Sequence, residues 1–252
     1  MRRQRKAAPV TLSEEDGLRY LHFGTEWIQG GMRMARPFAL ELEYQRQMMA
    51  VGLFLPEPRR IVQLGLGAAA LTKFCWREVV SASVVAVELS LDVIETARAW
   101  FCLPPDDARL NIVNADAREF ISHPRQRGLA DWLQVDLYDA AARGPVYDDV
   151  AFYRACRKTL RAPGVASFNL FGASFDPSFA AIASAFDDRV LVLPEVDAGN
   201  RVVLAIVGPP LAVPFAALDQ RARDLEARWK LKARGWVAGL RRANTFGARF
   251  EL

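Results

Sequence analysis

Short apolar runs alternate with amphipathic stretches through the middle of the chain. Between residues 59 and 208, the runs RRIVQLG, SVVAVE, RLNIVNAD, ADWLQVD and GVASFNLFG have the length and β-branched content of buried strands. The segments between them, such as LDVIETARAWF and DDVAFYRACRKTL, place apolar residues at helical spacing. Strand–helix alternation is typical of a parallel, doubly wound α/β sheet. We therefore predict a Rossmann-like fold, in which RVLVLPEV and NRVVLAIVG could form an antiparallel edge.

The hydrophobic pattern differs on both sides of this region. Residues 17–34 mix aromatic and β-branched residues around glycines and predict two short strands in a hairpin. Residues 38–52 predict a helix with apolar residues at spacings of four. Residues 215–242 predict an amphipathic surface helix, whose partner could be the same chain or a second subunit. Its apolar positions include Leu218, Leu225, Trp229 and Trp236.

These changes predict three parts. Residues 1–55 form the N-terminal β-hairpin and helix, residues 56–210 the Rossmann-like catalytic domain, and residues 211–252 a basic amphipathic C-terminal helix and tail. With 52% hydrophobic residues the chain can bury a large core, and no run of about 18 apolar residues predicts a membrane span. No apolar segment follows the basic start MRRQRKAAPV, so we expect no secretory signal and a cytoplasmic location.

Charge and metal-binding residue types narrow the function further. Three cysteines and two histidines lie far apart, which predicts no metal site. Residues 1–6 hold four basic residues and no acid, and residues 220–252 hold nine basic and three acidic residues, so the segment between them is net acidic. Basic ends could bind nucleic acid, but we favour solvated termini and expect no nucleic-acid partner. The acidic middle suits a cationic substrate.

The stretch LGLGAAA places Gly65 and Gly67 between a buried strand and a helix, where a ligand can approach the backbone closely. The next strand ends at Glu88, whose carboxylate could accept hydrogen bonds from both hydroxyls of a ribose. Alternatively, Glu88 could cap the following helix, although Ser90 is an equally good cap. Asp116, after the third strand, could accept a hydrogen bond from an adenine amino group or cap the helix AREFIS. Together these strand ends fit an adenosine across the carboxyl edge of the sheet.

The fourth strand ends in acidic and aromatic residues. Asp136 follows ADWLQV, and Tyr138 and Asp139 come two and three positions after it. At this edge of the sheet, these side chains lie where the reactive group of a bound cofactor would lie. The alternative is a loop whose acids are solvated or cap the helix near Asp148.

The order of these motifs resembles the spermidine synthase family of aminopropyltransferases, which share the fold of S-adenosylmethionine-dependent methyltransferases. The resemblance covers roughly residues 17–207 and depends on ELEYQRQMM, LGLGAAALTKF, the acids Glu88 and Asp116, and DLYD followed by AFYRACRKTL. It implies transfer of an aminopropyl group from decarboxylated S-adenosylmethionine to a polyamine amine, without a metal. It also implies a homodimer or a higher oligomer, as do the predicted exposed hairpin and amphipathic tail.

The resemblance assigns roles to particular residues. Asp136 would be the catalytic carboxylate, assisted by Tyr44, and Asp139 would bind an amine of the substrate. Gln45 would line the substrate–cofactor junction with Tyr44. The position of Tyr138 after the fourth strand, not the resemblance, predicts that it contacts the substrate. The remaining roles concern the cofactor: Gly65 and Gly67 would shape its loop, Glu88 would hold its ribose and Asp116 would contact adenine.

Three departures from the family pattern leave other functions open. Ala68 stands where the family has the aspartate that anchors the aminopropyl amine, Ala140 replaces an expected proline, and the loop after Asp136 is about two residues longer. A methyltransferase using intact S-adenosylmethionine is the first alternative, since the amine anchor is missing. A catalytically degraded nucleoside-binding homologue is the second.

Overall fold

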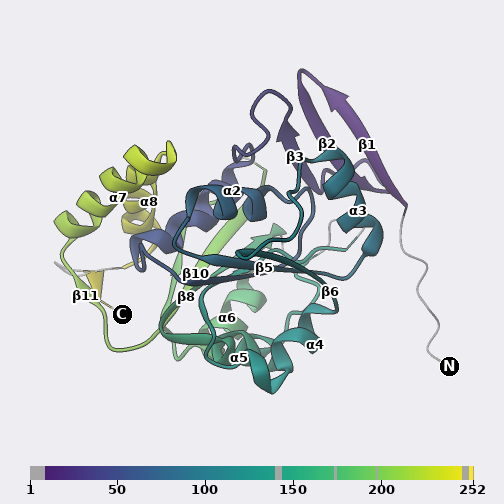
Figure 1. Cartoon of the computed structure of the whole chain (residues 1–252). Helices are drawn as coiled ribbons and strands as arrows, with labels where there is room; N and C mark the ends of the chain where they lie inside the picture. Colours follow the sequence, from purple (N-terminus) through teal and green to yellow (C-terminus); the bar gives the residue numbers. More distant parts are fainter. Residues whose placement is uncertain (1–8, 140–143, 173–174, 197, 246–249, 252) are drawn as a thin grey trace.

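The computed structural model describes residues 9–139, 144–172, 175–196, 198–245 and 250–251. A seven-stranded sheet with the order β6-β5-β4-β7-β8-β10-β9 forms its centre (Figure 1). Only β10 is antiparallel to its two neighbours, β8 and β9. The predicted parallel sheet and its antiparallel edge are both confirmed. The strands are β4 (Arg60–Leu64), β5 (Ser83–Glu88), β6 (Leu110–Asn114), β7 (Ala130–Val135), β8 (Leu160–Phe171), β9 (Val190–Val192) and β10 (Asn200–Val207).

Helices cover both faces of this sheet, which explains why its strands read as nearly continuous apolar runs. Side chains alternate between the faces: Ile61 belongs to one hydrophobic cluster, whereas Val62 and Leu64 belong to the other. The first face packs against α2 (Ala70–Glu78) and α3 (Leu91–Trp100). The second packs against α4 (Ala117–Ser122), α5 (Val150–Thr159) and α6 (Phe175–Ala185), which lie below the sheet in Figure 1.

A small antiparallel sheet precedes the large one. It contains β1 (Val10–Glu15), β2 (Leu18–Phe23) and β3 (Gly30–Arg33) in that order. The predicted hairpin is the β2–β3 pair, but β1 was missed because VTLSEE is largely exposed and carries little apolar signal. Helix α1 (Glu43–Met48) begins five residues later than predicted, after a turn in which the Ala39 amide donates to the Arg36 carbonyl. It continues into the 3-10 helix η1 (Met49–Leu53).

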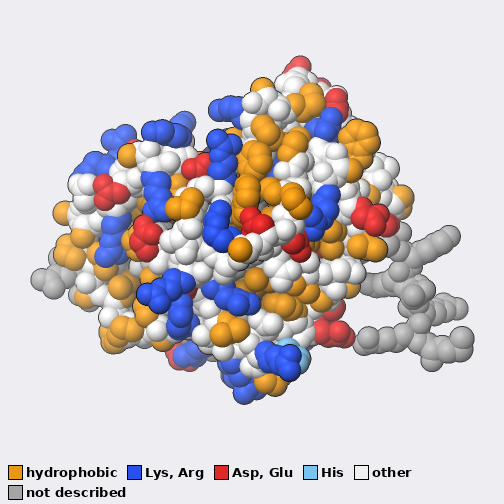
Figure 2. All heavy atoms as spheres, in the orientation of Figure 1, with side chains coloured by type: hydrophobic (Ala, Val, Ile, Leu, Met, Phe, Trp, Pro, Cys, Tyr) orange, Lys and Arg blue, Asp and Glu red, His pale blue; other side chains and the backbone are white. Residues whose placement is uncertain are grey.

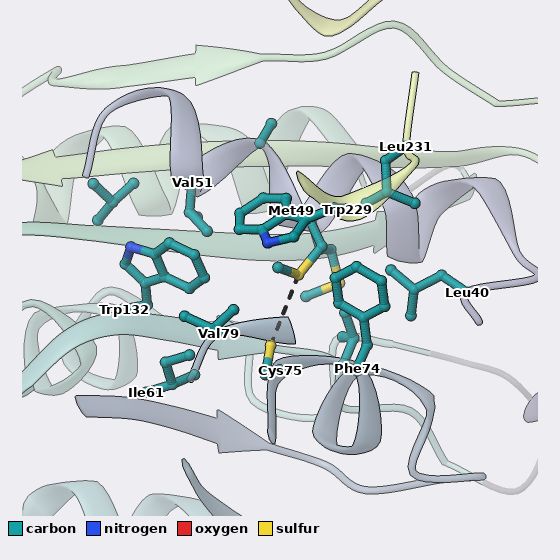
Figure 3. Close-up of a cluster of buried hydrophobic side chains, with 14 of the residues drawn as sticks. Leu40, Met49, Val51, Ile61, Phe74, Cys75, Val79, Trp132, Trp229 and Leu231 are labelled. Atoms are coloured by element: carbon teal, nitrogen blue, oxygen red, sulfur yellow. Dashed lines mark hydrogen bonds between the residues drawn. The ribbon is translucent and has the colours of Figure 1, made fainter. Parts of the chain in front are cut away.

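The C-terminal segment forms two helices, α7 (Phe215–Trp229) and α8 (Ala233–Ala243), not the single helix predicted. Lys230 ends α7 in a left-handed conformation with φ 58°, which turns the chain back. The outer surface of this helix pair carries many basic side chains (Figure 2). Its apolar face is buried in the same chain: Trp229 lies edge-on to Trp132 of β7, with ring centroids 6.2 Å apart (Figure 3). No helix in the described ranges is long and apolar enough to cross a membrane.

Candidate active site

A cavity of about 550 Å³ opens at the carboxyl edge of the parallel strands, where ligands of open α/β sheets bind. Residues that follow β4, β5, β6 and β7 form its floor, and the β2–β3 segment and α1 contribute to its walls. Of the nine site residues expected from the sequence, eight line this cavity: Tyr44, Gln45, Gly65, Gly67, Glu88, Asp116, Asp136 and Tyr138.

Asp136 is held at the end of β7 by close packing of two chain segments. Its amide donates to the Leu64 carbonyl at 2.9 Å. Gly65 follows with φ +92°, and a Cβ at this position would lie only 2.1 Å from the Asp136 carbonyl oxygen. A side chain at position 65 would therefore push the two strand ends apart. The first glycine of the loop is thus required to place Asp136.

The Asp136 carboxylate accepts hydrogen bonds on both oxygens. The Tyr44 hydroxyl donates to Oδ2 at 3.2 Å, and the Asn169 amide donates to Oδ1 at 2.9 Å. Asn169 is in turn fixed by the Asn200 amide, which donates to Asn169 Oδ1 at 3.1 Å. Sequence analysis missed both asparagines. The available signal was a polar residue near the end of one largely apolar strand, β8, and another at the start of β10, which pairs with it.

Burial governs the protonation of this group. It raises the pKa of Asp136 above its ordinary value, and the hydrogen bonds from Asn169 and Tyr44 partly offset that rise. Burial, together with the Asp136 charge, raises the pKa of Tyr44 well above 10, so its hydroxyl remains a donor. Gln45 donates to the Tyr44 oxygen at 3.4 Å, and its own Oε1 is buried without a partner among the described residues. The cluster thus offers a carboxylate and a free acceptor to a ligand that donates hydrogen bonds.

Glu88 organises the glycine loop. Its Oε2 accepts from the Leu66 amide at 3.1 Å, and its Oε1 accepts from the Ser90 amide at 2.9 Å. The cap of α3 is Ser90, whose hydroxyl accepts from the Val93 amide, so Glu88 does not cap that helix. Burial raises the pKa of Glu88, and these amide hydrogen bonds lower it. Glu88 also lines the cavity, so its carboxylate is accessible to a bound ligand.

Asp116 and Asp139 differ from the other predicted residues. Asp116 caps α4 through the Glu119 amide at 3.0 Å and accepts a hydrogen bond from Tyr147, while it also lines the cavity. The capping alternative is therefore confirmed, and its contact with adenine remains a prediction. Asp139 does not line the cavity; its backbone oxygen accepts from the Gln29 side chain at 3.2 Å. Ala140 and the longer loop lie outside the described residues.

The remaining acid of the fourth-strand region has structural partners. Asp148 accepts hydrogen bonds from Tyr153 at 2.8 Å and from Ser178 at 2.7 Å, and the neighbouring Asp149 caps α5. Neither residue lines the cavity. The Tyr138 hydroxyl, in contrast, points back to the sheet and donates to the Asn169 carbonyl at 3.0 Å. The alternative of capping acids therefore applies to these later residues and not to Asp136.

Ala68 is buried where the glycine loop meets β3. A Cβ on Gly30 would lie 2.7 Å from the Ala68 Cβ, so small residues face each other at this contact. A longer side chain at position 68 would have to displace the β3 backbone or turn into the cavity. The alanine that replaces the family's aspartate thus allows the N-terminal sheet to pack closely on the glycine loop.

The charges around the cavity have one sign. Four carboxylates line it, and no lysine, arginine or histidine does so among the described residues. Glu26, in the β2–β3 segment, makes no hydrogen bond or ion pair with another described residue, whereas the other three carboxylates do. Within the described ranges, no group of acidic, histidine and cysteine side chains could hold a metal ion. The lining carboxylates are Glu26, Glu88, Asp116 and Asp136.

Solved structures with this fold include aminopropyltransferases and a methyltransferase. A probable spermidine synthase from Corynebacterium glutamicum has a TM-score of 0.71 at 18% identity, covering 94% of this chain and 93% of its own. Human methyltransferase-like protein 13, in complex with SAH, has a TM-score of 0.68 at 20% identity, covering 75% of this chain and 93% of its own. A spermidine synthase in complex with the transition-state analogue AdoDATO has a TM-score of 0.66 at 19% identity, covering 92% and 83%. At these identities the likeness establishes the fold alone.

Sequence comparison distinguishes between an aminopropyltransferase and a methyltransferase, which share this fold. No family model matches the chain. A polyamine aminopropyltransferase from Chromobacterium violaceum is 32% identical over 237 residues, which cover 93% of this chain and 90% of the relative. A second, from Neisseria meningitidis serogroup B, is 30% identical over 247 residues and covers 96% and 93%. With relatives of this identity over nearly the whole length, the chain belongs to the polyamine aminopropyltransferase family.

Proposed function

We propose that this protein transfers the aminopropyl group of decarboxylated S-adenosylmethionine to an amine of a polyamine, with Asp136 as the base. The observation that carries the proposal is the buried Asp136 carboxylate, held by Tyr44 and Asn169 in a cavity lined by acids and by no described basic side chain. The family relationship supports the same reaction.

The chemistry requires a neutral amine. An alkylamine with a pKa near that of lysine, about 10.4, costs roughly 4–5 kcal/mol to deprotonate at pH 7. In the proposed step the amine nitrogen attacks the aminopropyl carbon bonded to sulfur, the C–S bond breaks, and the sulfur leaves as the thioether of methylthioadenosine. The proton released by the nitrogen goes to Asp136. A carboxylate with a raised pKa is a stronger base for this transfer.

Two hydrogen bonds orient the base. Tyr44 and Asn169 occupy one lone pair on each Asp136 oxygen, which leaves another on each to face the amine. The unpaired Oε1 of Gln45 would accept a hydrogen bond from the same amine or from its neighbour in the substrate. These neighbours fix the direction of attack, which lowers the entropic part of the barrier.

The nucleoside half would bind at the glycine loop. Gly65 and Gly67 expose the backbone there, and Glu88, held by the Leu66 and Ser90 amides, would accept hydrogen bonds from the ribose hydroxyls. The cavity volume of about 550 Å³ lies within the usual range for ligands of this size. Asp116 would meet the adenine with the oxygen lone pairs that Glu119 and Tyr147 leave free.

The charge of the lining favours the decarboxylated donor over intact S-adenosylmethionine. The decarboxylated molecule carries a sulfonium and an ammonium, both attracted by the four lining carboxylates. The intact molecule adds a carboxylate, for which no described lining residue offers a basic partner. Since Ala68 cannot anchor the aminopropyl amine, we assign that role to Glu26, whose carboxylate has no partner among the described residues.

Product analysis by mass spectrometry tests the proposal. Purified protein is incubated with putrescine and either decarboxylated or intact S-adenosylmethionine. Methylthioadenosine and spermidine from the first mixture are expected. No product from the first mixture, together with S-adenosylhomocysteine from the second, would assign the protein to methyl transfer. Binding of methylthioadenosine without turnover of any amine would make it a degraded homologue.

The expected homodimer and cytoplasmic location remain predictions. Light scattering on the eluting protein measures the mass directly, and a monomer at micromolar concentration would contradict the dimer.

A further inference from the structure

A buried polar layer lies beneath the proposed active site. Gln63, Gln134 and Ser167 are paired neighbours on β4, β7 and β8. Their exposed fractions are 2%, 1% and 0%. Each precedes by two positions in the chain a residue of the site edge, namely Gly65, Asp136 or Asn169. Because side chains in a strand alternate with period two, the polar layer lies on the same face of the sheet as the Asp136 carboxylate.

Two members of this layer belong to a continuous chain of hydrogen bonds. Thr72 Oγ1 donates to Gln63 Oε1 at 2.7 Å, and Gln63 Nε2 donates to Gln134 Oε1 at 2.7 Å. Gln134 Nε2 then donates to the Met48 carbonyl at 3.4 Å. The chain begins at Thr72 of α2, which lines the cavity, and ends at the last residue of α1. It therefore links the helix after the glycine loop to the helix that carries Tyr44.

The surroundings of this chain are apolar. The sheet face around the two glutamines belongs to a large hydrophobic cluster that includes Ile61 and Trp132. Cys75 and Met49 contact the chain through sulfur, and Figure 3 shows Cys75 directed at Met49, with 3.8 Å between the sulfur atoms. A hydrogen-bonded pair of buried amides adds little to stability compared with apolar side chains of the same shape. Stability alone therefore gives no reason for two glutamines here, whereas a requirement for fixed geometry does.

We propose that Gln63 and Gln134 are positioning residues that lock α1 against the sheet so that the Tyr44 hydroxyl meets Asp136. Tyr44 lies one helical turn before Met48 on α1, so a hold on the Met48 carbonyl restrains rotation and sliding of the turn that presents Tyr44. Thr72 ties the same restraint to the glycine-loop helix. The Tyr44–Asp136 pair and the glycine loop are thereby held in fixed positions relative to each other. This inference depends on the proposed function for its effect on rate, but not for its effect on α1.

The test is the double variant Gln63→Met with Gln134→Met, which keeps the length of both side chains and removes the amides. Ser167→Ala is the matched control, because Ser167 lies in the same layer and its hydroxyl is buried without a partner among the described residues. We expect the double variant to fold, with a melting temperature lowered only by the lost partners of the Thr72 hydroxyl and the Met48 carbonyl. It should lose about ten- to a hundredfold in kcat through misplacement of Tyr44. The control should match the wild type in both.

A cycle with Tyr44→Phe separates positioning from a general structural effect. If the glutamines act through Tyr44, adding Tyr44→Phe to the double variant should cost much less than it costs in the wild type. Multiplied losses would overturn the inference. Hydrogen exchange provides a readout without catalysis: amides of residues 43–53 should exchange faster in the double variant, with β4 and β7 unchanged. Unchanged exchange at α1, or uniformly faster exchange everywhere, would also overturn it.

Two further measurements apply if the double variant does not fold or if the wild type is inactive. If the double variant does not fold, Thr72→Val removes the hydroxyl at the cavity end of the chain in a side chain of equal size, and the same exchange and rate measurements apply. If the wild type forms no product with any amine, the proposed function fails, and exchange at residues 43–53 alone decides the positioning role.

Discussion

Replacing Asp136 with asparagine removes the charge of the proposed base at nearly constant size, and it replaces the oxygen that accepts from Tyr44 with an NH2 group. The new amide group would keep the size of the side chain, and its oxygen could still accept a hydrogen bond from Asn169. Because burial raises the pKa of Asp136, its ionised form is less stable in the folded protein than in the unfolded chain at neutral pH. Asp136→Asn removes that cost, so the melting temperature should be equal to or above that of the wild type.

The expected loss of activity follows from the proton. Without a base, the enzyme must bind the small fraction of amine that is already neutral, a cost of roughly 4–5 kcal/mol at pH 7. A positioned general base typically contributes about 10²–10⁴-fold in rate. We therefore expect kcat/KM to fall by about three orders of magnitude, within that range. Gly65, Gly67 and Glu88 do not depend on the Asp136 charge, so methylthioadenosine affinity should stay within about threefold, well under the 1.4 kcal/mol of a tenfold change.

Spermidine formation by mass spectrometry and methylthioadenosine binding by calorimetry measure the two halves separately. The control is Asp224→Asn, the same chemical change on α7, whose residue does not line the cavity. Its rate should equal the wild-type rate. Activity of Asp136→Asn within about threefold of the wild type, with nucleoside binding intact, would refute the assignment of Asp136 as the base.

Three further predictions concern other parts of the structure. In Tyr44→Phe, the hydrogen bond that lowers the Asp136 pKa is lost, so that pKa rises. Activity requires the carboxylate and is lost below its pKa, so the acidic limb of the kcat–pH profile should move to higher pH; a limb that stays or moves down contradicts the contact. In Glu26→Gln, the KM for the decarboxylated donor should rise about two- to fivefold at low salt and by less at high salt, as for exposed ion pairs; an unchanged KM would exclude Glu26 as the amine anchor. Trp229→Ala should lower the free energy of unfolding by about 3–5 kcal/mol, measured in urea, because the ring fills the core between η1 and β7; a loss below about 1 kcal/mol would mean that this core closes over the gap.

Most strands and helices of the large sheet region could be predicted from local sequence patterns. Each strand of the Rossmann-like region is an apolar run because both of its faces are covered by helices. The helices between them are recognised by apolar residues at helical spacing. The N-terminal strand Val10–Glu15 could not be predicted, because an exposed edge strand is held by backbone hydrogen bonds to its neighbour β2 and needs few apolar side chains. The turn at Lys230 was equally hidden, because its left-handed conformation occurs at a residue without a glycine or proline signal.

At the site, the acids and glycines at the strand ends could be predicted from the chain alone, because Gly65, Glu88, Asp116 and Asp136 each stand at the end of an apolar run. Which of these residues face one cavity depends on strand register and on packing between distant segments, and so could be read only from the folded structure. It joined Asn169 and Asn200 to Asp136, left Asp139 off the lining and aligned Gln63 with Gln134 beneath the site. Hydrogen bonds between side chains 31 to 92 positions apart leave no local pattern in the chain, and so they become visible only when the sheet is assembled.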